Sequence, residues 1–295
     1  MRVAIIINPT ANKGKPVALK DRLYRGFASR GVHCDSYVTE KPGDGTVLAR
    51  NAVEKGAETV VAVGGDGTVN EVINGIAGTG ATLGVLPAGT VNVCARELGI
   101  PFNVKKAVEV IAEGRVKHID LGMANNHHFV LMAGLGFDAE VVAHVFKPVK
   151  DILGASAYVL KGLETLARYS ATNITLEMPE ETYKASAFLV IVANFSTYTY
   201  NLKIAPYASP ESGFLDICVF ESSVLDKLKF IRQVADVFLN RHLLNDGVKY
   251  FRTSRVKISS SPEIMAQLDG DAFMPTPLEI KSVPHSLPVL VPADK

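Results

Sequence analysis

Short apolar runs alternate with helical patterns over the first 122 residues of the chain. The runs at residues 3–7, 59–63 and 83–86 are rich in Val, Ile and Leu, and each ends at Asn, Gly or Pro, so they predict buried strands. Two further strands are expected over residues 32–39 and 116–121. Helical spacing of apolar residues predicts helices at 19–31, 45–55, 69–76 and 105–113. This alternation predicts a three-layer α/β domain, in which helices cover both faces of a parallel sheet.

The pattern changes near residue 122. Strand-like runs then follow one another closely, and only two helical patterns interrupt them, at 152–170 and 224–240. Such spacing favours antiparallel sheets over β–α–β units. We therefore predict two domains, residues 1–122 and residues 123–283, the second mostly an antiparallel β-sandwich. Its strands are expected at 128–133, 173–178, 183–193, 215–220, 256–260, 263–268 and 277–282, with another apolar run at 287–291.

Composition and net charge argue against a nucleic-acid-binding, disulfide-rich or membrane-spanning protein. The 295 residues are 47% hydrophobic and carry a net charge of +1, so a sizeable core can form and no broad basic field for nucleic acid is expected. The three cysteines are far apart, which favours a reducing cytoplasm over a disulfide framework. The N-terminal apolar run is too short for a signal peptide, and no run approaches the ~18 residues of a membrane span.

The stretch from Glu58 to Ile76 combines a strand, a glycine turn and a helix. Gly64, Gly65 and Gly67 let the backbone approach a ligand, and the helix start that follows suits an anion such as phosphate. Asp66 would repel phosphate unless Mg²⁺ lies between them. The alternative is a tight turn in which Asp66 merely caps the helix.

Residues 64–75, Gly-Gly-Asp-Gly-Thr-Val-Asn-Glu-Val-Ile-Asn-Gly, resemble the signature of the diacylglycerol kinase catalytic-domain family. That family includes bacterial soluble lipid kinases, sphingosine kinases and ceramide kinases, and NAD kinases share the Gly-Gly-Asp-Gly-Thr core. The continuation through Asn70, Glu71 and Asn74-Gly75 favours the lipid kinases. The resemblance implies ATP and Mg²⁺ as cofactors. It assigns the nucleotide to Gly64, Gly65, Asp66, Gly67, Thr68, Asn70 and Glu71, with Asp66 also as a metal ligand.

Further nucleotide contacts are implied at the ends of neighbouring strands. An Asn8-Pro9 loop with Lys13 and Lys15 follows the first strand, where α/β sheets bind ligands, although a solvated loop is the alternative. The segment Pro87–Pro101 resembles a second family motif, but Val93 stands where the family commonly has Asp. Arg96 in the same segment could pair with a phosphate or with a neighbouring carboxylate. The implied contacts are Asn8, Pro9, Lys13, Thr39, Thr90 and Asn92.

Two aspartates carry the implied chemistry. Asp269 lies in Gln-Leu-Asp-Gly-Asp, residues 267–271, which on the residues alone predicts a tight turn between strands. It also resembles the family's Asp-Gly-Glu, whose first Asp is the proposed general base. The resemblance therefore makes Asp269 the base, with Asp120 supporting it, whereas the alternative for Asp120 is an ordinary turn aspartate.

Asp216 is a second candidate metal ligand. The segment Ala205–Asp216 resembles a family motif in which two aspartates precede the glycine, but here the pair is Glu211-Ser212. A serine is a weaker ligand than a carboxylate for a hard cation. The structural Mg²⁺ site of relatives would therefore have to be rebuilt here around Asp216, Glu211 or nearby carbonyls.

The helix expected at 224–240 has an apolar stripe of Leu225, Leu228, Ile231, Ala235 and Phe238 flanked by basic residues. Two interpretations stay open. The stripe can pack into the core like that of most helices, or the helix can lie on an anionic membrane.

These observations predict an ATP-dependent lipid kinase that transfers the γ-phosphoryl group of Mg-ATP to a hydroxyl of diacylglycerol or a related lipid. The alternatives are an NAD kinase-like enzyme and a non-catalytic lipid- or nucleotide-binding protein, which Val93 and Ser212 would favour. The expected partners are a lipid substrate and, transiently, a membrane surface, with no nucleic acid; a homodimer stays open. The expected location is the cytoplasm, peripheral at the membrane. The resemblance also implies that segment 284–295 returns to the first domain.

Overall fold

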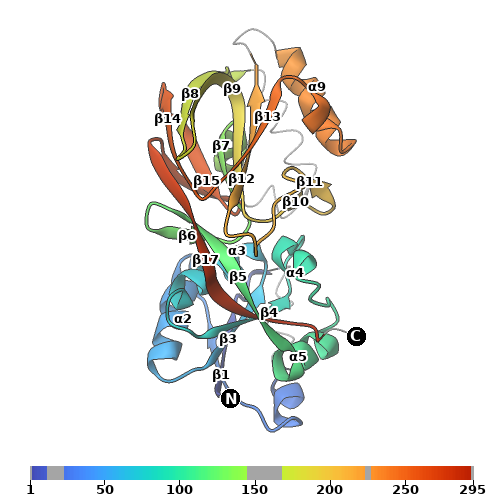
Figure 1. Cartoon of the computed structure of the whole chain (residues 1–295). Helices are drawn as coiled ribbons and strands as arrows, with labels where there is room; N and C mark the ends of the chain where they lie inside the picture. Colours follow the sequence, from blue (N-terminus) through green and yellow to red (C-terminus); the bar gives the residue numbers. More distant parts are fainter. Residues whose placement is uncertain (1, 12–22, 145–167, 223–226, 294–295) are drawn as a thin grey trace. The chain divides into compact units, whose positions relative to one another are not determined.

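The computed structural model describes residues 2–11, 23–144, 168–222 and 227–293. The chain divides into two compact units (Figure 1). The first unit contains Met1–Leu121 together with Val283–Lys295, and the second contains Gly122–Ser282. Within the described residues, no helix has both the length and the apolar character needed to cross a membrane.

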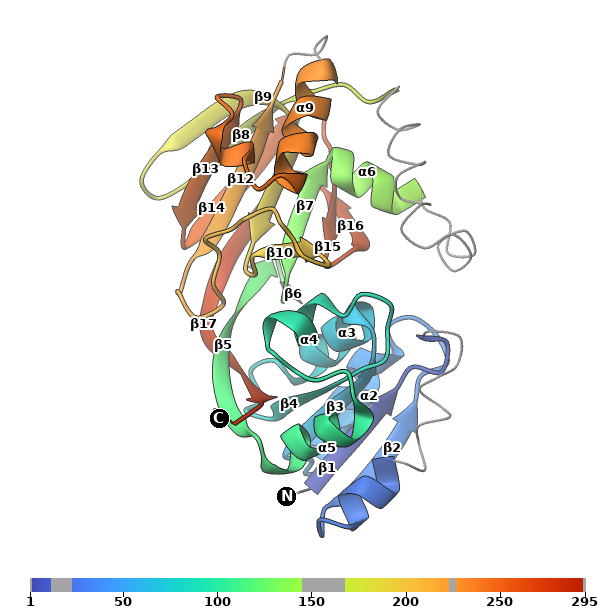
Figure 2. The ribbon, with the colours of Figure 1, turned by 90° about the vertical axis from the view of Figure 1, so that its right-hand side faces the viewer.

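The first unit is built on a parallel sheet. Strands β1 (Arg2–Ile7), β2 (His33–Val38), β3 (Thr59–Gly64) and β4 (Thr82–Pro87) lie in the order β2-β1-β3-β4. The C-terminal part of β17 (Leu278–Val291) joins β4, with Val289 opposite Leu83 in parallel register. The four strands therefore end at one common edge, visible in Figure 2.

Helices cover this sheet because successive residues of a buried strand point to opposite faces. Val3, Ile5 and Ile7 of β1 belong to a core cluster with α5 (Val104–Glu113) and the helical residues 23–28. Helices α2 (Asp44–Glu54) and α3 (Asp66–Ile76) pack against each other and against β1 and β3. A short helix, α4 (Val93–Glu97), follows β4. The predicted three-layer α/β architecture is confirmed.

The second unit is an antiparallel β-sandwich. Its organising strand is β9 (Thr182–Ala193), whose first half pairs with β8 (Thr172–Glu177) and whose second half pairs with β7 (Met132–Gly136) and β12 (Leu215–Glu221). The path β16-β15-β7-β9-β8-β14-β17 completes the main sheet. Its remaining elements are β6 (His127–Phe129), α6 (Phe137–His144), β10 (Thr197–Thr199), β11 (Leu202–Lys203), α9 (Lys227–Phe238), the 3₁₀ turn η2 (His242–Leu244), β13 (Val248–Thr253), β14 (Arg255–Ser261), β15 (Met265–Leu268) and β16 (Asp271–Pro275). Strand β5 (Arg115–Ala124) leads from the first unit into this one.

Three details differ from the sequence-based expectations. The strand expected at 128–133 is split between β6 and β7, and α6 follows where no helix was predicted. The two runs at 277–282 and 287–291 form one continuous strand, β17, despite Pro284 and Pro288. Prolines are tolerated in a strand where no ladder hydrogen bond requires their missing N–H. The helix expected at 152–170 lies almost wholly outside the described residues.

Candidate functional site

The carboxyl edge of the parallel sheet brings several predicted residues together. Asn8 follows β1 and donates its backbone N–H to the Val63 carbonyl at 3.1 Å. Thr39 follows β2, is buried, and donates its N–H to Ile7 at 2.9 Å. The N–H of Ala88, after β4, donates to the Gly64 carbonyl at 2.8 Å. The loops after four adjacent strands therefore begin side by side.

The Asn8 side chain links the first of these loops to α3. Its Nδ2 donates to Thr68 Oγ1 at 3.1 Å, and its Oδ1 accepts from the N–H and hydroxyl of Thr10 at 3.0 and 2.9 Å. Pro9 lies within the loop that these bonds close. Lys13 and Lys15, predicted to contact the nucleotide, lie outside the described residues.

Two glycine turns touch through their backbones. A Cβ added to Gly89 would lie 2.4 Å from the Cα of Gly65, a distance that no side chain allows. The turn after β3 and the turn after β4 can approach this closely only because residue 89 is glycine, whereas a Cβ on Gly65 would lie 3.3 Å from the Cα of Gly89. Helix α3 begins immediately after Gly65 without a side-chain cap, so its first N–H groups have no intrahelical acceptor. Thr90 is exposed in the second turn.

Asp66 spans these two turns. Its Oδ2 accepts from the N–H of Val93 and its Oδ1 from the N–H of Cys94, both at 3.0 Å. It therefore caps α4, from a distant part of the chain, while Gly65 occupies the cap position of its own helix. Burial raises the pKa of the Asp66 carboxyl, and the hydrogen bonds from Cys94 and Val93 offset only part of this rise.

Asn92 closes the second glycine turn. Its backbone is left-handed, with φ of 54°, a conformation that asparagine tolerates better than most residues. Its Oδ1 accepts from the Gly89 N–H at 2.9 Å, and its Nδ2 donates to the Gly89 carbonyl at 3.0 Å. Arg96, in α4, donates from Nε to the Val91 carbonyl and stacks over the Phe102 ring. The side chains of the second motif thus shape their own loop.

Glu71 and Asn70 bond to neighbouring helices and turns. The Glu71 carboxylate accepts from the N–H groups of Gly43 and Gly45, at 2.9 and 2.8 Å, and thereby anchors the start of α2. Asn70 is buried, and its Oδ1 accepts from Asn74 one turn further along α3. Their predicted contact with the nucleotide stays a prediction. The arrangement itself gives Glu71 a clear structural task.

Asp120 and Asp269 each bind the backbone of a distant segment. Asp120 is fully buried in β5, and its Oδ1 accepts from the N–H of His285 at 2.8 Å, where β17 adopts a left-handed φ of 48°. In the second unit, Asp269 Oδ1 accepts from the N–H groups of Leu131 and Met132 at 2.8 and 3.0 Å, while Oδ2 accepts from Val130 at 2.8 Å. The direction of the Asp269 carboxylate is thus fixed.

A buried network that the sequence did not indicate supports the Asp269 turn. Gln267 Oε1 accepts from the N–H of Gly270 at 2.6 Å, and Gln267 Nε2 donates to Asp138 at 2.7 Å. Tyr198 donates its hydroxyl to the other oxygen of Asp138. Burial raises the pKa of Asp138, and the two side-chain hydrogen bonds, from Tyr198 and Gln267, offset part of that rise. No spacing in the sequence connects these residues, since α6, β10 and β15 are far apart along the chain.

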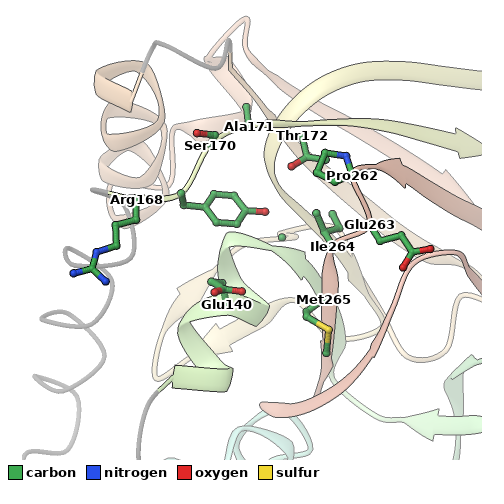
Figure 3. A pocket seen from close by; sticks show the side chains of 11 residues that line it. Glu140, Arg168, Ser170, Ala171, Thr172, Pro262, Glu263, Ile264 and Met265 are labelled. Carbon is green, nitrogen blue, oxygen red and sulfur yellow. The ribbon is translucent and has the colours of Figure 1, made fainter.

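The second unit also contains a cavity of about 360 Å³. Figure 3 shows Ile264 and Met265 along one side and Glu140, from α6, on another, while Arg168 points away from them. Met265 begins β15, the strand that leads to Asp269. Besides these four, the lining residues are Gly136, Tyr169, Ser170, Ala171, Thr172, Pro262 and Glu263.

Known proteins match this chain along its whole length. The family description "Diacylglycerol kinase catalytic domain" matches residues 2–124, and "YegS C-terminal NAD kinase beta sandwich-like domain" matches residues 132–291. A curated protein of Bacillus subtilis named "Diacylglycerol kinase" is 31% identical, over 100% of this chain and 97% of its own length. One of Staphylococcus saprophyticus with the same name is also 31% identical, over 99% and 96%.

The chain belongs to the diacylglycerol kinase family. It is a lipid kinase, as the catalytic-domain match and these relatives indicate. A crystal structure described as a diacylglycerol kinase from Bacillus anthracis is 25% identical and superposes with a TM-score of 0.79, covering 98% of this chain and 96% of its own. Another structure from that organism, 24% identical with a TM-score of 0.83, shares the fold.

This member of the diacylglycerol kinase family differs from the expected metal pattern at two places. Val93, at the position where an aspartate was expected, has no side-chain ligand for a metal, and its backbone N–H donates to Asp66 Oδ2. Asp216 is fully buried, and its two oxygens accept from Arg252 Nε at 2.9 Å and Nη2 at 3.1 Å. The same hydrogen bonds raise the pKa of Arg252. A cation at Asp216 would therefore compete with a guanidinium already in place.

Proposed function

We propose that this lipid kinase transfers the γ-phosphoryl group of ATP to a hydroxyl of diacylglycerol or a related lipid. The observation that carries the nucleotide assignment is the contact between the two glycine turns, beside the uncapped start of α3. Helix starts with free N–H groups bind phosphate, and glycines let the backbone approach it. The names of the curated relatives support diacylglycerol as the acceptor.

The first unit would hold the nucleotide. Backbone N–H groups at Gly65–Thr68 would bind the phosphates, because any side chain at Gly89 would fill the space where the turns meet. The loops that begin at the same edge would supply the remaining contacts. By this proposal the lining residues are Asn8, Pro9, Lys13, Thr39, Gly64, Asn70, Glu71, Thr90 and Asn92.

The side chains present fit a Mg²⁺ ion that arrives with the nucleotide. Among the residues that the structure describes, no group of three His, Cys, Asp or Glu side chains could hold a metal by itself. Asp66 offers one carboxylate, which already accepts from the N–H groups of Val93 and Cys94. One carboxylate plus phosphate oxygens is an ordinary Mg²⁺ arrangement. When bound, Mg²⁺ would neutralise charge on the phosphates.

Asp269 would accept the proton of the acceptor hydroxyl. Its three backbone donors leave the carboxylate no freedom to rotate away, and a positioned base of this kind contributes about 10²–10⁴-fold to a rate. Asp120 would act indirectly, through the strand that it anchors at His285. The rest of the catalysis would be positioning and charge neutralisation.

The cavity of the second unit is a candidate site for part of the acceptor. Its wall combines the apolar Ile264 and Met265 with polar groups such as Glu140, a mixture that suits a lipid near its hydroxyl. Met265→Trp should fill the cavity, raising KM for the lipid while leaving KM for ATP unchanged. Equal KM values for the lipid in both proteins would exclude the cavity as an acceptor site.

The deciding experiment is incubation with γ-labelled ATP and a panel of lipid alcohols, with and without Mg²⁺. We expect label in the phosphorylated lipid only when Mg²⁺ is present, and at least a hundredfold less label with Asp269→Asn. A parallel incubation with NAD tests the NAD kinase alternative. Label in NAD but in no lipid would overturn the proposal.

A further inference from the structure

Helix α9 is held against the sheet by one side that is only partly apolar. Its buried residues are Phe230, Gln233 and Val237. Phe230 stacks on Phe188 of β9, with ring centroids 4.8 Å apart, and meets Phe220 of β12 edge-on at 6.4 Å. Both views show α9 beside these strands (Figures 1 and 2). These contacts fix the rotation of the helix about its axis.

Gln233 makes this rotation unambiguous. Its Nε2 donates to the carbonyls of Glu221 and Gly247, both at 2.8 Å, in a buried setting. A turn of the helix that buried another side would remove both of these hydrogen bonds, each worth about 0.5–1.5 kcal/mol, although the Gly247 carbonyl would keep the N–H of Glu221. Gln233 therefore faces the sheet because its side chain donates to these two carbonyls.

The opposite side of α9 is apolar and faces solvent. Leu228 is 78% exposed, Phe238 68%, Leu239 57% and Ile231 45%, and Ala235 is also exposed. At 3.6 residues per turn, these five residues fall within an arc of about 100°. We call them the outer face of α9. Leu225 of the predicted stripe lies outside the described residues, and its other four residues contact solvent instead of the core.

Basic residues accompany the outer face. Between positions 227 and 246 the chain has four Lys or Arg residues and two Asp residues, a net charge of +2. Arg232 lies directly beside the outer face and is exposed. Asp236 is paired with Arg241 at 3.8 Å, and Asp246 is exposed in the loop beyond η2. Leu244 is 82% exposed in η2, which contacts α9.

We propose that the outer face of α9 docks this enzyme on an anionic membrane. A contiguous exposed apolar surface marks an interaction site. A helix with large apolar side chains on one face and Lys or Arg beside them lies in the headgroup region of anionic bilayers. A second protein copy would meet the same net positive charge, whereas an anionic lipid surface complements it. The inference deepens the proposed function, because it names the surface through which the kinase reaches its acceptor.

The docking helix and the cavity share one aromatic cluster. Tyr169 lines the cavity and lies against Phe137 and Phe188, with ring centroids 5.8 and 5.9 Å apart. Both of those rings contact Phe230, the buried anchor of α9. The cavity is therefore connected to α9 through two successive sets of rings, first Tyr169 and then Phe137 and Phe188.

Vesicle sedimentation of the full chain, without ATP, tests the docking independently of catalysis. Phosphatidylcholine vesicles containing one third phosphatidylglycerol should bind the protein, and pure phosphatidylcholine should bind it weakly. The double variant Leu228→Ser/Phe238→Ser should reduce binding at least tenfold, because it removes the two most exposed side chains of the outer face. Arg232→Gln should reduce binding about fivefold, the value of one cation at an anionic surface.

The matched control is Val47→Ser/Val116→Ser, which removes two apolar side chains that are 55% and 48% exposed in the first unit. It should bind vesicles like the unmodified chain. Unchanged vesicle binding by the Leu228/Phe238 variant would overturn the proposal. So would a dimer in sedimentation equilibrium that this variant abolishes while vesicle binding persists, since the face would then be an interface between copies.

A second arm separates this inference from the proposed kinase activity. With a short-chain diacylglycerol that dissolves in water, the Leu228/Phe238 variant should keep its kcat, whereas with vesicle-borne diacylglycerol its rate should fall with its binding. If the unmodified chain binds vesicles but phosphorylates neither acceptor, the proposed function fails and the docking surface stands. If both acceptors are phosphorylated equally well by the variant, the docking surface fails and the function stands.

Discussion

Replacement of Asp269 by Asn separates its structural task from its proposed chemical one. The carboxylate accepts three backbone N–H groups, two at Oδ1 and one at Oδ2. In the variant, the remaining oxygen can keep Leu131 and Met132, but the new NH₂ group faces the N–H of Val130. One charge-assisted bond is lost, which costs about 1.5–3 kcal/mol of unfolding free energy. For a unit of this size, the melting temperature should fall by roughly 3–12 °C.

The same variant should lose far more activity than stability. An amide cannot accept the hydroxyl proton, so kcat should fall about 10²–10⁴-fold, equivalent to roughly 2.7–5.4 kcal/mol of activation free energy. The fall should be seen at temperatures where circular dichroism shows the variant fully folded. ATP affinity should not change, because Asp269 belongs to the second unit.

Glu177→Gln is the matched control, since it also turns a carboxylate into an amide, at an exposed position of β8. It should leave both kcat and the melting temperature unchanged within error. The reasoning is refuted if Asp269→Asn keeps kcat within tenfold of the unmodified chain. Equal losses of ATP binding and turnover would instead make Asp269 a purely structural residue.

Three further substitutions test the site and its supports. Gly89→Ala should weaken ATP binding and cost about 1–3 kcal/mol of stability, because the added Cβ would lie 2.4 Å from the Cα of Gly65. Isothermal titration calorimetry measures the ATP affinity, and an unchanged affinity would contradict this prediction. Arg252→Ala leaves Asp216 buried without its partner and should cost about 3 kcal/mol in denaturant unfolding, the low end because the Arg252 side chain is 45% exposed. Recovery of that stability with millimolar Mg²⁺ would support the metal site predicted there, and no recovery would count against it. Burial raises the pKa of Asp138 in the folded chain, so the folded state holds the proton more tightly and unfolding free energy falls as pH rises from about 4 toward the raised value. The Asn variant at position 138 lacks this titration, so its stability relative to the unmodified chain should increase over that range; a pH-independent difference between the two would contradict the assignment.

The α/β part of the fold could be predicted from the sequence because the spacing of apolar residues within each segment identifies it as a strand or a helix. Strands β1, β3 and β4 are apolar runs that end at Asn, Gly or Pro, and the observed bounds lie within one residue of the predicted ones. The glycine turn after β3 was also predictable, since three glycines interrupt a strand and precede a helical pattern. These local sequence patterns predict the structure correctly because the tertiary contacts of each segment favour the same secondary structure as its own sequence.

What could not be predicted is which side of an element faces inward. The stripe of α9 has the spacing of a core-facing helix, yet Leu228 and Phe238 are exposed while Gln233 is buried. The deciding contacts are two carbonyls, of Glu221 and Gly247, that a glutamine side chain satisfies. Periodicity measures how apolar residues are grouped around a helix, but it carries no information about acceptors on other segments.

The acidic residues of the motifs have one structural task in common, and it changes how their variants must be interpreted. Asp66, Glu71, Asp120 and Asp269 each accept backbone N–H groups from a segment distant in the sequence, namely α4, the start of α2, β17 and the residues before β7. Loss of activity on replacing any of them by Ala therefore cannot by itself identify a metal ligand or a base, because each replacement also releases a loop or strand. The Asn and Gln variants are more informative, since they keep one acceptor oxygen and remove the charge. A residue that acts only as an anchor should tolerate that exchange with a modest fall in melting temperature and little change in kcat, whereas a base or metal ligand should lose turnover while the fold persists.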